Sequence, residues 1–315
     1  MRVGLLTDAA CDLPAGFLAE QGVGIMPIHL HFGNRIVPDV HEVSTTLGFY
    51  RSCLADRDMP AETTPLSVPE MVECFKTLTA KYERAIFIPI GKTRSKIYEN
   101  AVRAASAVGR ISGSATHPEH HQNATDPFSI HVIDSQTLFT GQGILVYEAA
   151  RALHQDMPYM PLIQYIQRLV RDVHSFLIPS DMHFLRTHAR DGGDDSIDRV
   201  HYWLGTELDM KPIVSAWLGE TEVIAQARGF EPALQQLIDM TVHKIEQRLI
   251  VPAVAVSYAG DPSVIAGKEM YRKFVAKAKR HGVEVMTSVM SPTGGINVGP
   301  GALALSYAGG YGNRI

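Results

Sequence analysis

The sequence predicts an α/β protein with two domains, and three observations support this. The chain has 315 residues. A chain of this length is usually too long to fold around a single hydrophobic core, so two domains are expected. Short apolar runs alternate with helical patterns through about residue 155, as in a parallel sheet flanked by helices. The second half mixes hairpin spacing with strand–helix–strand units, which predicts a mixed sheet. We expect an N-terminal α/β domain at 1–160 and a C-terminal mixed α/β domain at 161–315.

The first half alternates between the two kinds of element. Its predicted strands are the apolar runs at 3–7, 23–30, 84–90 and 130–134. Its predicted helices lie at 14–21, 69–82, 95–108 and 143–154. Pro27 makes its strand irregular or an edge strand, and Asp12 before Pro14 is typical of a helix start. The polar stretch 109–127 predicts an inserted surface loop.

The second half has more strands in close succession. Its predicted strands lie at 175–178, 211–218, 222–227, 253–258 and 283–289. Its predicted helices lie at 162–172, 232–248 and 263–280. Gly219 and Glu220 separate two strands and predict a hairpin turn. The loop 299–301 near the chain end is followed by a predicted short helix from Ala302.

The composition narrows the classes of partner. The chain has 29 basic and 33 acidic residues and a net charge of −4, whereas nucleic acids and anionic membrane surfaces require a basic face. We therefore expect no nucleic-acid partner. No apolar run reaches the roughly 20 residues of a membrane-spanning helix, so no integral membrane segment is expected. The start of the chain reads as a strand and not as a signal peptide, which predicts a cytoplasmic protein.

Metal and cofactor signals are weak. Three cysteines, Cys11, Cys53 and Cys74, are far apart, which predicts reduced thiols and argues against disulfides or a zinc site. A histidine group lies within 109–127, where a solvated polar loop is the better interpretation. The members of that group are His117, His120 and His121. We predict neither a metal nor a cofactor.

Three distant stretches, 63–67, 95–98 and 297–302, carry one kind of chemistry. Each offers hydroxyl, amide or backbone N–H donors at a predicted loop or helix start. None places a nucleophile beside a general base, as catalysis by a side-chain nucleophile requires. Donors without a base suit a site that holds an anion, so we expect a binding protein rather than an enzyme.

The segment 6–14, LTDAACDLP, resembles the N-terminal signature of the DegV family. Further landmarks of that family follow in order over almost the whole chain, apart from 109–127. They lie at 63–67, 91–101, 132–135, 141–143, 211–213, 227–229 and 298–303. The resemblance implies a two-domain α/β protein with a long-chain fatty acid in an apolar tunnel between its domains. In some members it also implies delivery of that acid to a fatty acid kinase.

The resemblance also suggests residues for the ligand head group. Thr63, with Thr64 beside it, and Ser95 match the segments that hold the carboxylate, and Ser95 would add the favourable N-terminus of a helix. Arg228 matches a basic position near the head group, and Asn297 lies where the family usually has His. The 297–302 loop is expected to return to the head group. The supporting positions are Asp8, Gly299 and Gly301.

The sequence departs from the family pattern in three places. Asn297 can donate and accept hydrogen bonds, but unlike His it carries neither charge nor proton. Ala9 removes a hydroxyl that the family has after the Thr-Asp pair. The region where kinase-delivering relatives are basic is acidic here, through Asp191, Asp194, Asp195 and Asp198. The fatty acid is therefore a firmer expectation than the kinase.

Several other interpretations stay open. Ser95 can simply cap its helix and Thr63 can simply shape a turn, which are common roles for these residues. A phosphoryl- or acyl-transfer enzyme related to dihydroxyacetone kinase would place Asp8 near a metal. The departures from the family pattern at Asn297 and Ala9 favour a third interpretation, a carrier of another amphiphilic acid.

Overall fold

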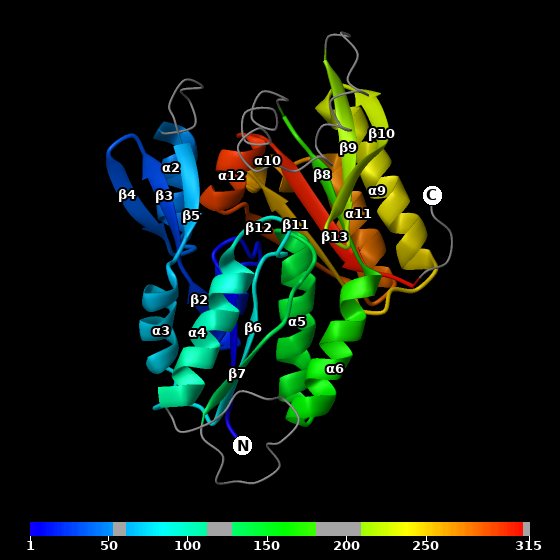
Figure 1. Ribbon diagram of the computed structural model, residues 1–315. Helices are drawn as coiled ribbons and strands as arrows, with labels where there is room; N and C mark the ends of the chain where they lie inside the picture. The colour runs from blue at the N-terminus through cyan, green and yellow to red at the C-terminus, as the bar shows by residue number, and fades with distance from the viewer. Residues whose placement is uncertain (53–60, 112–127, 181–208, 311–315) are drawn as a thin grey trace.

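The computed structural model describes residues 1–52, 61–111, 128–180 and 209–310. Within these residues the strands form three sheets: four strands, all parallel, in the order β2-β1-β6-β7; six mixed strands in the order β10-β9-β8-β13-β11-β12; and three antiparallel strands in the order β4-β3-β5. Helices pack on these sheets in layers (Figure 1). The predicted α/β class, with a parallel sheet followed by a mixed sheet, is confirmed.

The first half builds the parallel sheet and its helices. Its strands are β1 (Val3–Asp8), β2 (Gly24–Met26), β6 (Arg84–Ile88) and β7 (Ser129–Val132). Its helices are α1 (Ala15–Glu20), α3 (Val68–Lys76), α4 (Ile97–Ile111), α5 (Thr140–His154) and α6 (Tyr159–Leu169).

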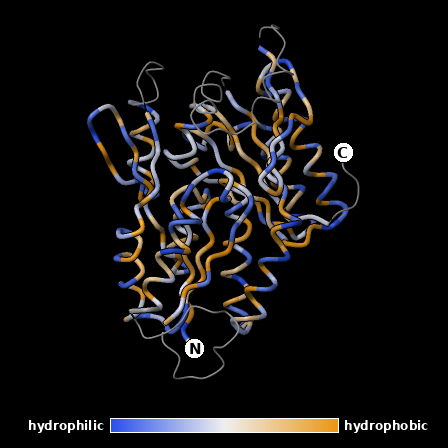
Figure 2. The backbone as a smooth tube through the Cα atoms, viewed as in Figure 1, coloured by the Kyte–Doolittle hydropathy of each residue, from blue (hydrophilic) through white to orange (hydrophobic). Residues whose placement is uncertain are grey.

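Side chains of β1 alternate between two cores because a strand has a period of two. Leu5 is buried in one cluster with Ile86 and with residues of α5 and α6. Leu6 is buried in another with Phe87 and with residues of α3 and α4. Figure 2 shows the apolar strands at the centre of this half. Helices therefore cover both faces, as the apolar runs predict.

The predicted strand at 23–30 is in fact two strands that belong to different sheets. Residues before Pro27 form β2, which pairs with β1 in the parallel sheet. Residues after it form β3 (Ile28–Phe32), which pairs with β4 (Arg35–Asp39) and β5 (Ala61–Pro65). Pro27 lacks an N–H and fits this transition. We call β3, β4, β5 and α2 (Val43–Ser52) the small lobe; it stands at the upper left in Figure 1.

The second half builds the six-stranded sheet. Its strands are β8 (Val173–Ile178), β9 (Met210–Trp217), β10 (Glu220–Arg228), β11 (Ala253–Tyr258), β12 (Glu284–Val289) and β13 (Leu303–Ala308). Its helices are α9 (Phe230–Glu246), α10 (Ser263–Ala266), α11 (Glu269–Arg280) and α12 (Pro292–Val298), and a 3₁₀ turn, Val170–Asp172, leads into β8. The predicted helix at 263–280 is divided into α10 and α11.

The prediction of a short helix from Ala302 is wrong. Residues Leu303–Ala308 form β13, which pairs antiparallel with both β8 and β11. All six residues are buried, so the strand lacks the polar alternation that identifies a half-exposed strand. The helix near this position, α12, comes before the glycine loop and was not predicted.

Helix α5 lies between the parallel sheet and the six-stranded sheet. It packs against β1 and β6 on one side and against β8, β11 and β13 on the other. One buried cluster accordingly contains Leu5 of β1 and Ala255 of β11. The domain boundary at residue 160 stays a prediction. Among the described helices, none combines the length and the apolar composition that crossing a membrane would need.

Candidate functional site

Thr63 lies on the inner face of the small lobe. It is half-buried on β5 and directly opposite Leu30 of β3, and directly opposite residues in an antiparallel pair share a face. Leu30 is buried in a cluster with Ile296 and Val298 of α12, and α12 packs against both strands. The Thr63 side chain is therefore directed to the side where α12 lies.

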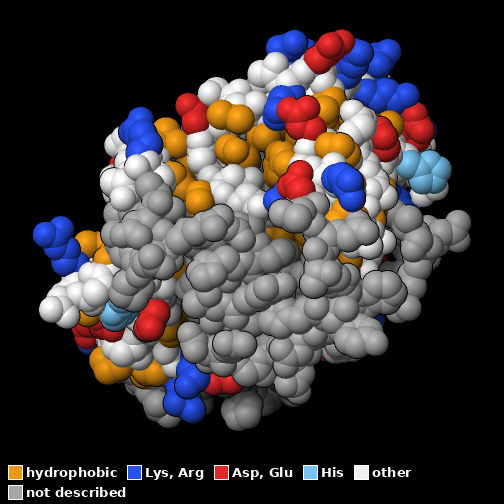
Figure 3. All heavy atoms as spheres, turned by 90° about the horizontal axis from the view of Figure 1, so that it is seen from above, with side chains coloured by type: hydrophobic (Ala, Val, Ile, Leu, Met, Phe, Trp, Pro, Cys, Tyr) orange, Lys and Arg blue, Asp and Glu red, His pale blue; other side chains and the backbone are white. Residues whose placement is uncertain are grey.

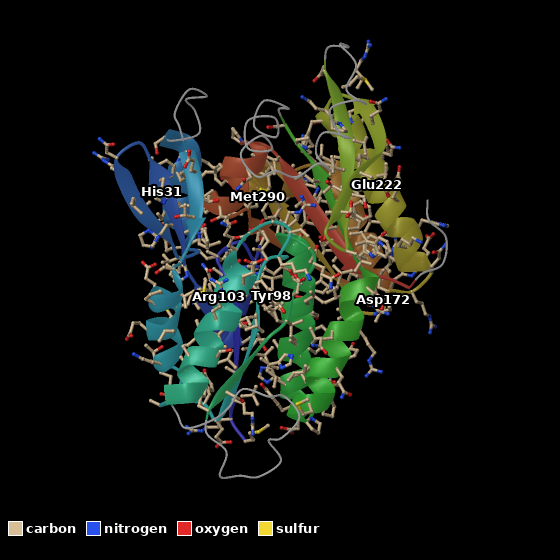
Figure 4. The ribbon with its side chains drawn as sticks, viewed as in Figure 1. His31, Tyr98, Arg103, Asp172, Glu222 and Met290 are labelled. Carbon is tan, nitrogen blue, oxygen red and sulfur yellow. The ribbon has the colours of Figure 1, made fainter. Side chains whose placement is uncertain are left out.

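Thr64 is directed to the outer face of the same strand, because successive side chains alternate. Its hydroxyl lies 2.7 Å from Nε2 of His31 on the neighbouring strand. Figure 4 shows His31 on the small lobe, above Tyr98 and Arg103 of α4. Thr63 and Thr64 are neighbours in sequence, but the strand places their hydroxyl groups on opposite faces.

Ser95 lies two residues before α4 begins. Its hydroxyl oxygen accepts a hydrogen bond from the N–H of Ile97 at 3.3 Å, so it caps the helix start while its own proton can still be donated. Asn100, in the first turn of α4, donates to the carbonyl of Leu66 at 2.9 Å. This bond ties the start of α4 to the segment that leaves the strand of Thr63.

Asn297 lies near the C-terminal end of α12. Its side-chain Nδ2 donates to the carbonyl of Thr293 at 2.7 Å, which leaves the amide oxygen and a second N–H. Gly299 and Gly301 follow with φ angles of 85° and 80°, the left-handed region that favours glycine. Their N–H groups donate to Gly295 and Ala259, so these glycines shape the loop and their N–H groups already have protein acceptors.

Arg228 lies in another part of the molecule, at the exposed end of β10. Its register partner is Met210, next to Lys211, whose ammonium donates to the carbonyl of Ser180 at 2.7 Å. The hydroxyl of Ser180 in turn donates to the carbonyl of Pro300. Arg228 is therefore on the six-stranded sheet, on the side of the glycine loop, while Thr63 is on the small lobe.

Asp8 is buried at the end of β1 and organises two loops. One carboxylate oxygen accepts the N–H of Ala10 at 3.0 Å and the other accepts that of Ile90 at 2.7 Å. Burial raises the pKa of Asp8 to about 6, although these N–H groups act in the opposite direction. Asp8 therefore helps to fix the backbone at Ala10 and Ile90.

Sequence reasoning missed the side chains that fix α12, chiefly Asp39 and Tyr50, and misread Asp12. Asp12 does not cap α1, which begins without any side-chain cap. Its carboxylate accepts from the hydroxyl of Ser257 at 2.7 Å and from the N–H of Ser291 at 2.9 Å. Both partners lie more than 240 residues away, so no local pattern could have revealed them.

A central apolar cluster connects the small lobe with the six-stranded sheet. Its buried members come from both halves of the chain, among them Phe49 of α2, Phe139, Val214 of β9, Met290, and Ile296 of α12. Met290 lies between the small lobe and β10 in Figure 4. In Figure 3, which shows the molecule from above, hydrophobic side chains are interspersed with white, uncharged atoms over part of this face. Leu30, opposite Thr63, and Ile296, next to Asn297 in sequence, belong to this cluster.

Some predicted features lie outside the described residues. These are the histidine group at 117–121, Cys53 and the acidic segment at 191–198. Across 1–52, 61–111, 128–180 and 209–310, no three His, Cys, Asp or Glu side chains converge as a metal site would require.

Comparisons with known proteins place this arrangement in a family. A family model described as "Uncharacterised protein, DegV family" matches residues 2–309. A DegV domain-containing protein of Xanthomonas axonopodis pv. citri is 36% identical over 309 residues, which cover 98% of each chain. One from Caldanaerobacter subterraneus is 24% identical over 76% of each chain.

Solved structures share the fold. A stearic acid-binding protein from Eubacterium ventriosum has a TM-score of 0.79 at 18% identity, and covers 98% of both chains. DegV, a fatty acid-binding protein from Bacillus subtilis, has a TM-score of 0.77 at 17% identity, over 98% of this chain and all of its own. The sequence match over nearly the full length and the shared fold agree, and the chain belongs to the DegV family.

Proposed function

We propose that this protein binds a long-chain fatty acid, with the carboxylate held by the hydroxyl groups of Thr63 and Ser95. The observation that carries the proposal is the inner-face position of Thr63, beside α12 and the central apolar cluster. The hydrogen bond from Asn100 to Leu66 links this strand to the helix start of Ser95. Relatives with the same fold are described as fatty acid-binding proteins, which supports the same ligand class here.

The two ends of such a ligand would contribute differently. Each buried methylene group contributes about 0.8 kcal/mol, so the tail supplies most of the binding free energy. A carboxylate taken out of water requires hydrogen-bond donors, or its desolvation opposes binding. Two hydroxyl groups, a helix N-terminus and the remaining N–H of Asn297 meet that need and fix the orientation of the acid.

In this proposal the protein is a non-catalytic cytoplasmic carrier that needs neither a metal nor an organic cofactor. The proposal includes one partner protein, a fatty acid kinase to which the carrier presents the acid. Arg228 is exposed on the side of the glycine loop, where a guanidinium could pair with a phosphate group brought by that partner. Thr64, whose hydroxyl already bonds His31, would support the strand rather than contact the acid.

Removing the two hydroxyl groups should weaken binding of stearate. The double variant Thr63→Val, Ser95→Ala keeps the apolar cluster, and we expect a rise in Kd of about tenfold or more, the loss of one or two bonds to a charged group. Fluorescence displacement or calorimetry measures it. Thr77→Val, on the exposed end of α3, is the matched control and should bind like the wild type.

Organic extraction of the purified protein followed by mass spectrometry tests the ligand class directly. We expect acyl chains with free carboxyl groups. A folded protein that carries no acyl chain and takes up no stearate would refute the proposal. If Thr64→Val impairs binding as much as Thr63→Val does, the carboxylate site would have to be assigned to the outer face of β5 instead.

A further inference from the structure

Helix α12 depends on outside contacts for its position. It has seven residues, too few to be stable alone, yet it carries Asn297 and leads into the loop 299–301. Its one N-terminal cap from its own segment is Ser291, whose hydroxyl accepts the N–H of Gly294 at 3.1 Å. The remaining N-terminal groups of α12 are held by other parts of the chain.

Asp39, the last residue of β4, is the main outside contact. Its Oδ2 accepts both the N–H of Thr293 at 3.1 Å and the hydroxyl of Thr293 at 2.8 Å. Its Oδ1 accepts the N–H of His41 at 3.1 Å. Only 3% of Asp39 is exposed, so both carboxylate oxygens depend on donors from the protein rather than from water. Because backbone N–H groups meet both oxygens, an amide in place of the carboxylate would turn a donor toward a donor.

Tyr50 adds a second contact from the small lobe. Its hydroxyl lies 3.0 Å from the carbonyl of Met290 and 3.1 Å from that of Ser291, just before α12. A Cβ atom on Gly295 would lie 2.3 Å from this hydroxyl, so α12 lies against α2 with no room for a side chain. The small lobe and α12 therefore fit together as one unit.

We propose that Asp39 is a positioning residue for ligand binding: it holds α12 against the small lobe, so that Asn297 stays beside the strand of Thr63. The inference rests on the proposed function, since Asp39 acts through α12 and does not itself contact the acid. Loss of this carboxylate loosens α12, and the head group then loses the fixed geometry of one of its donors.

Burial of Asp39 makes this anchor sensitive to pH. The titratable groups around it are His41 beyond the end of β4, Asp8 at the end of β1 and Tyr50 of α2. Asp12 lies next, beside His41 and Tyr50, and α12 itself has no titratable group. Burial raises the pKa of Asp39, so its anionic form is lost at a higher pH than for an exposed aspartate. Affinity should fall as the pH drops through that range.

Asp39→Asn and Asp12→Asn make a matched pair. At Asp12 the amide can keep both bonds, accepting from the N–H of Ser291 and donating to the hydroxyl oxygen of Ser257, whereas at Asp39 it cannot. We expect Asp39→Asn to raise the Kd for stearate about tenfold, and Asp12→Asn to change it less than about threefold. Thr293→Val, which removes only the hydroxyl bond, should lie between them and replaces Asp39→Asn if that variant does not fold.

Two further readouts separate positioning from general stability. Hydrogen–deuterium exchange of residues 291–299 in ligand-free protein should be faster in Asp39→Asn than in the wild type. The stearate concentration that slows this exchange in the wild type should not slow it in the variant. The pH dependence of Kd should shrink in Asp39→Asn and persist in Asp12→Asn. An unchanged Kd in Asp39→Asn, with or without faster exchange, overturns the positioning role. If the wild type binds no stearate, the proposed function fails, while the exchange rates still test the anchor.

Discussion

Asp12→Asn should stabilise the folded protein at pH 7 by up to about 3 kcal/mol and change its stability little near pH 4. Burial raises the pKa of Asp12 from 3.8 to about 6, with smaller opposing contributions from Ser257 and Ser291. One pKa unit corresponds to about 1.4 kcal/mol. Asp12 is therefore a buried charge at neutral pH, and the neutral amide avoids the cost of keeping that charge away from water.

The sign follows from proton linkage. The folded state binds the Asp12 proton more tightly than the unfolded state does, so the proton stabilises the fold fully below about pH 4. That stability is lost as the pH rises through about 6. Asparagine does not titrate, so the advantage of the variant should grow across the same interval.

Urea unfolding at a series of pH values measures this difference. The control is Asp239→Asn, at an exposed position of α9. It removes the same charge from the surface, so its stability relative to the wild type should not increase with pH. A stability difference between Asp12→Asn and the wild type that stays constant from pH 4 to pH 7 would contradict the assignment of Asp12 as a buried, proton-binding carboxyl.

Gly141→Ala should destabilise the protein by about 2 kcal/mol or more, even though alanine favours helices. Gly141 lies in the first turn of α5. An added Cβ would lie 2.0 Å from the hydroxyl oxygen of Ser175 and 2.3 Å from that of Thr137. These hydroxyl groups are 2.7 Å apart and buried, so neither can move away without breaking a hydrogen bond in the core.

Gly48→Ala is the matched control, because Gly48 lies inside α2 with open space around its Cβ position. It should be neutral or stabilise by roughly 0.5–1 kcal/mol. Adding Ser175→Ala to Gly141→Ala should recover part of the loss, since it removes the shorter contact. Chemical denaturation of the four proteins measures these effects, and equal stability of Gly141→Ala and Gly48→Ala would show that α5 can shift to accept a side chain.

The sequence was informative where a local pattern carries the physics. Apolar runs such as 84–90 and helical spacing such as 69–82 predict elements that the structure contains at 84–88 and 68–76. Pro27 signalled an irregular strand, and its covalent geometry explains the transition between sheets. The strand β13 was mistaken for a helix because burial on both faces erases the alternation on which strand prediction depends.

The candidate site shows the same division. The local pattern marked Thr63 and Ser95 as hydroxyl donors at a turn and a helix start, and the resemblance to the DegV family assigned them to the carboxylate. The opposite directions of Thr63 and Thr64 follow from strand alternation, but only once β5 is known to be a strand. Asp39 and Thr293 are 254 residues apart, and only the fold brings them together.

The position of α5 has a consequence for dividing the molecule. Of its fifteen residues, eleven are buried, far more than the single stripe that a surface helix hides. A fragment ending at residue 160 would keep this helix but leave bare the side that β8, β11 and β13 cover. Neither half is therefore expected to be self-sufficient, and split or permuted versions need to let both halves assemble around this one segment.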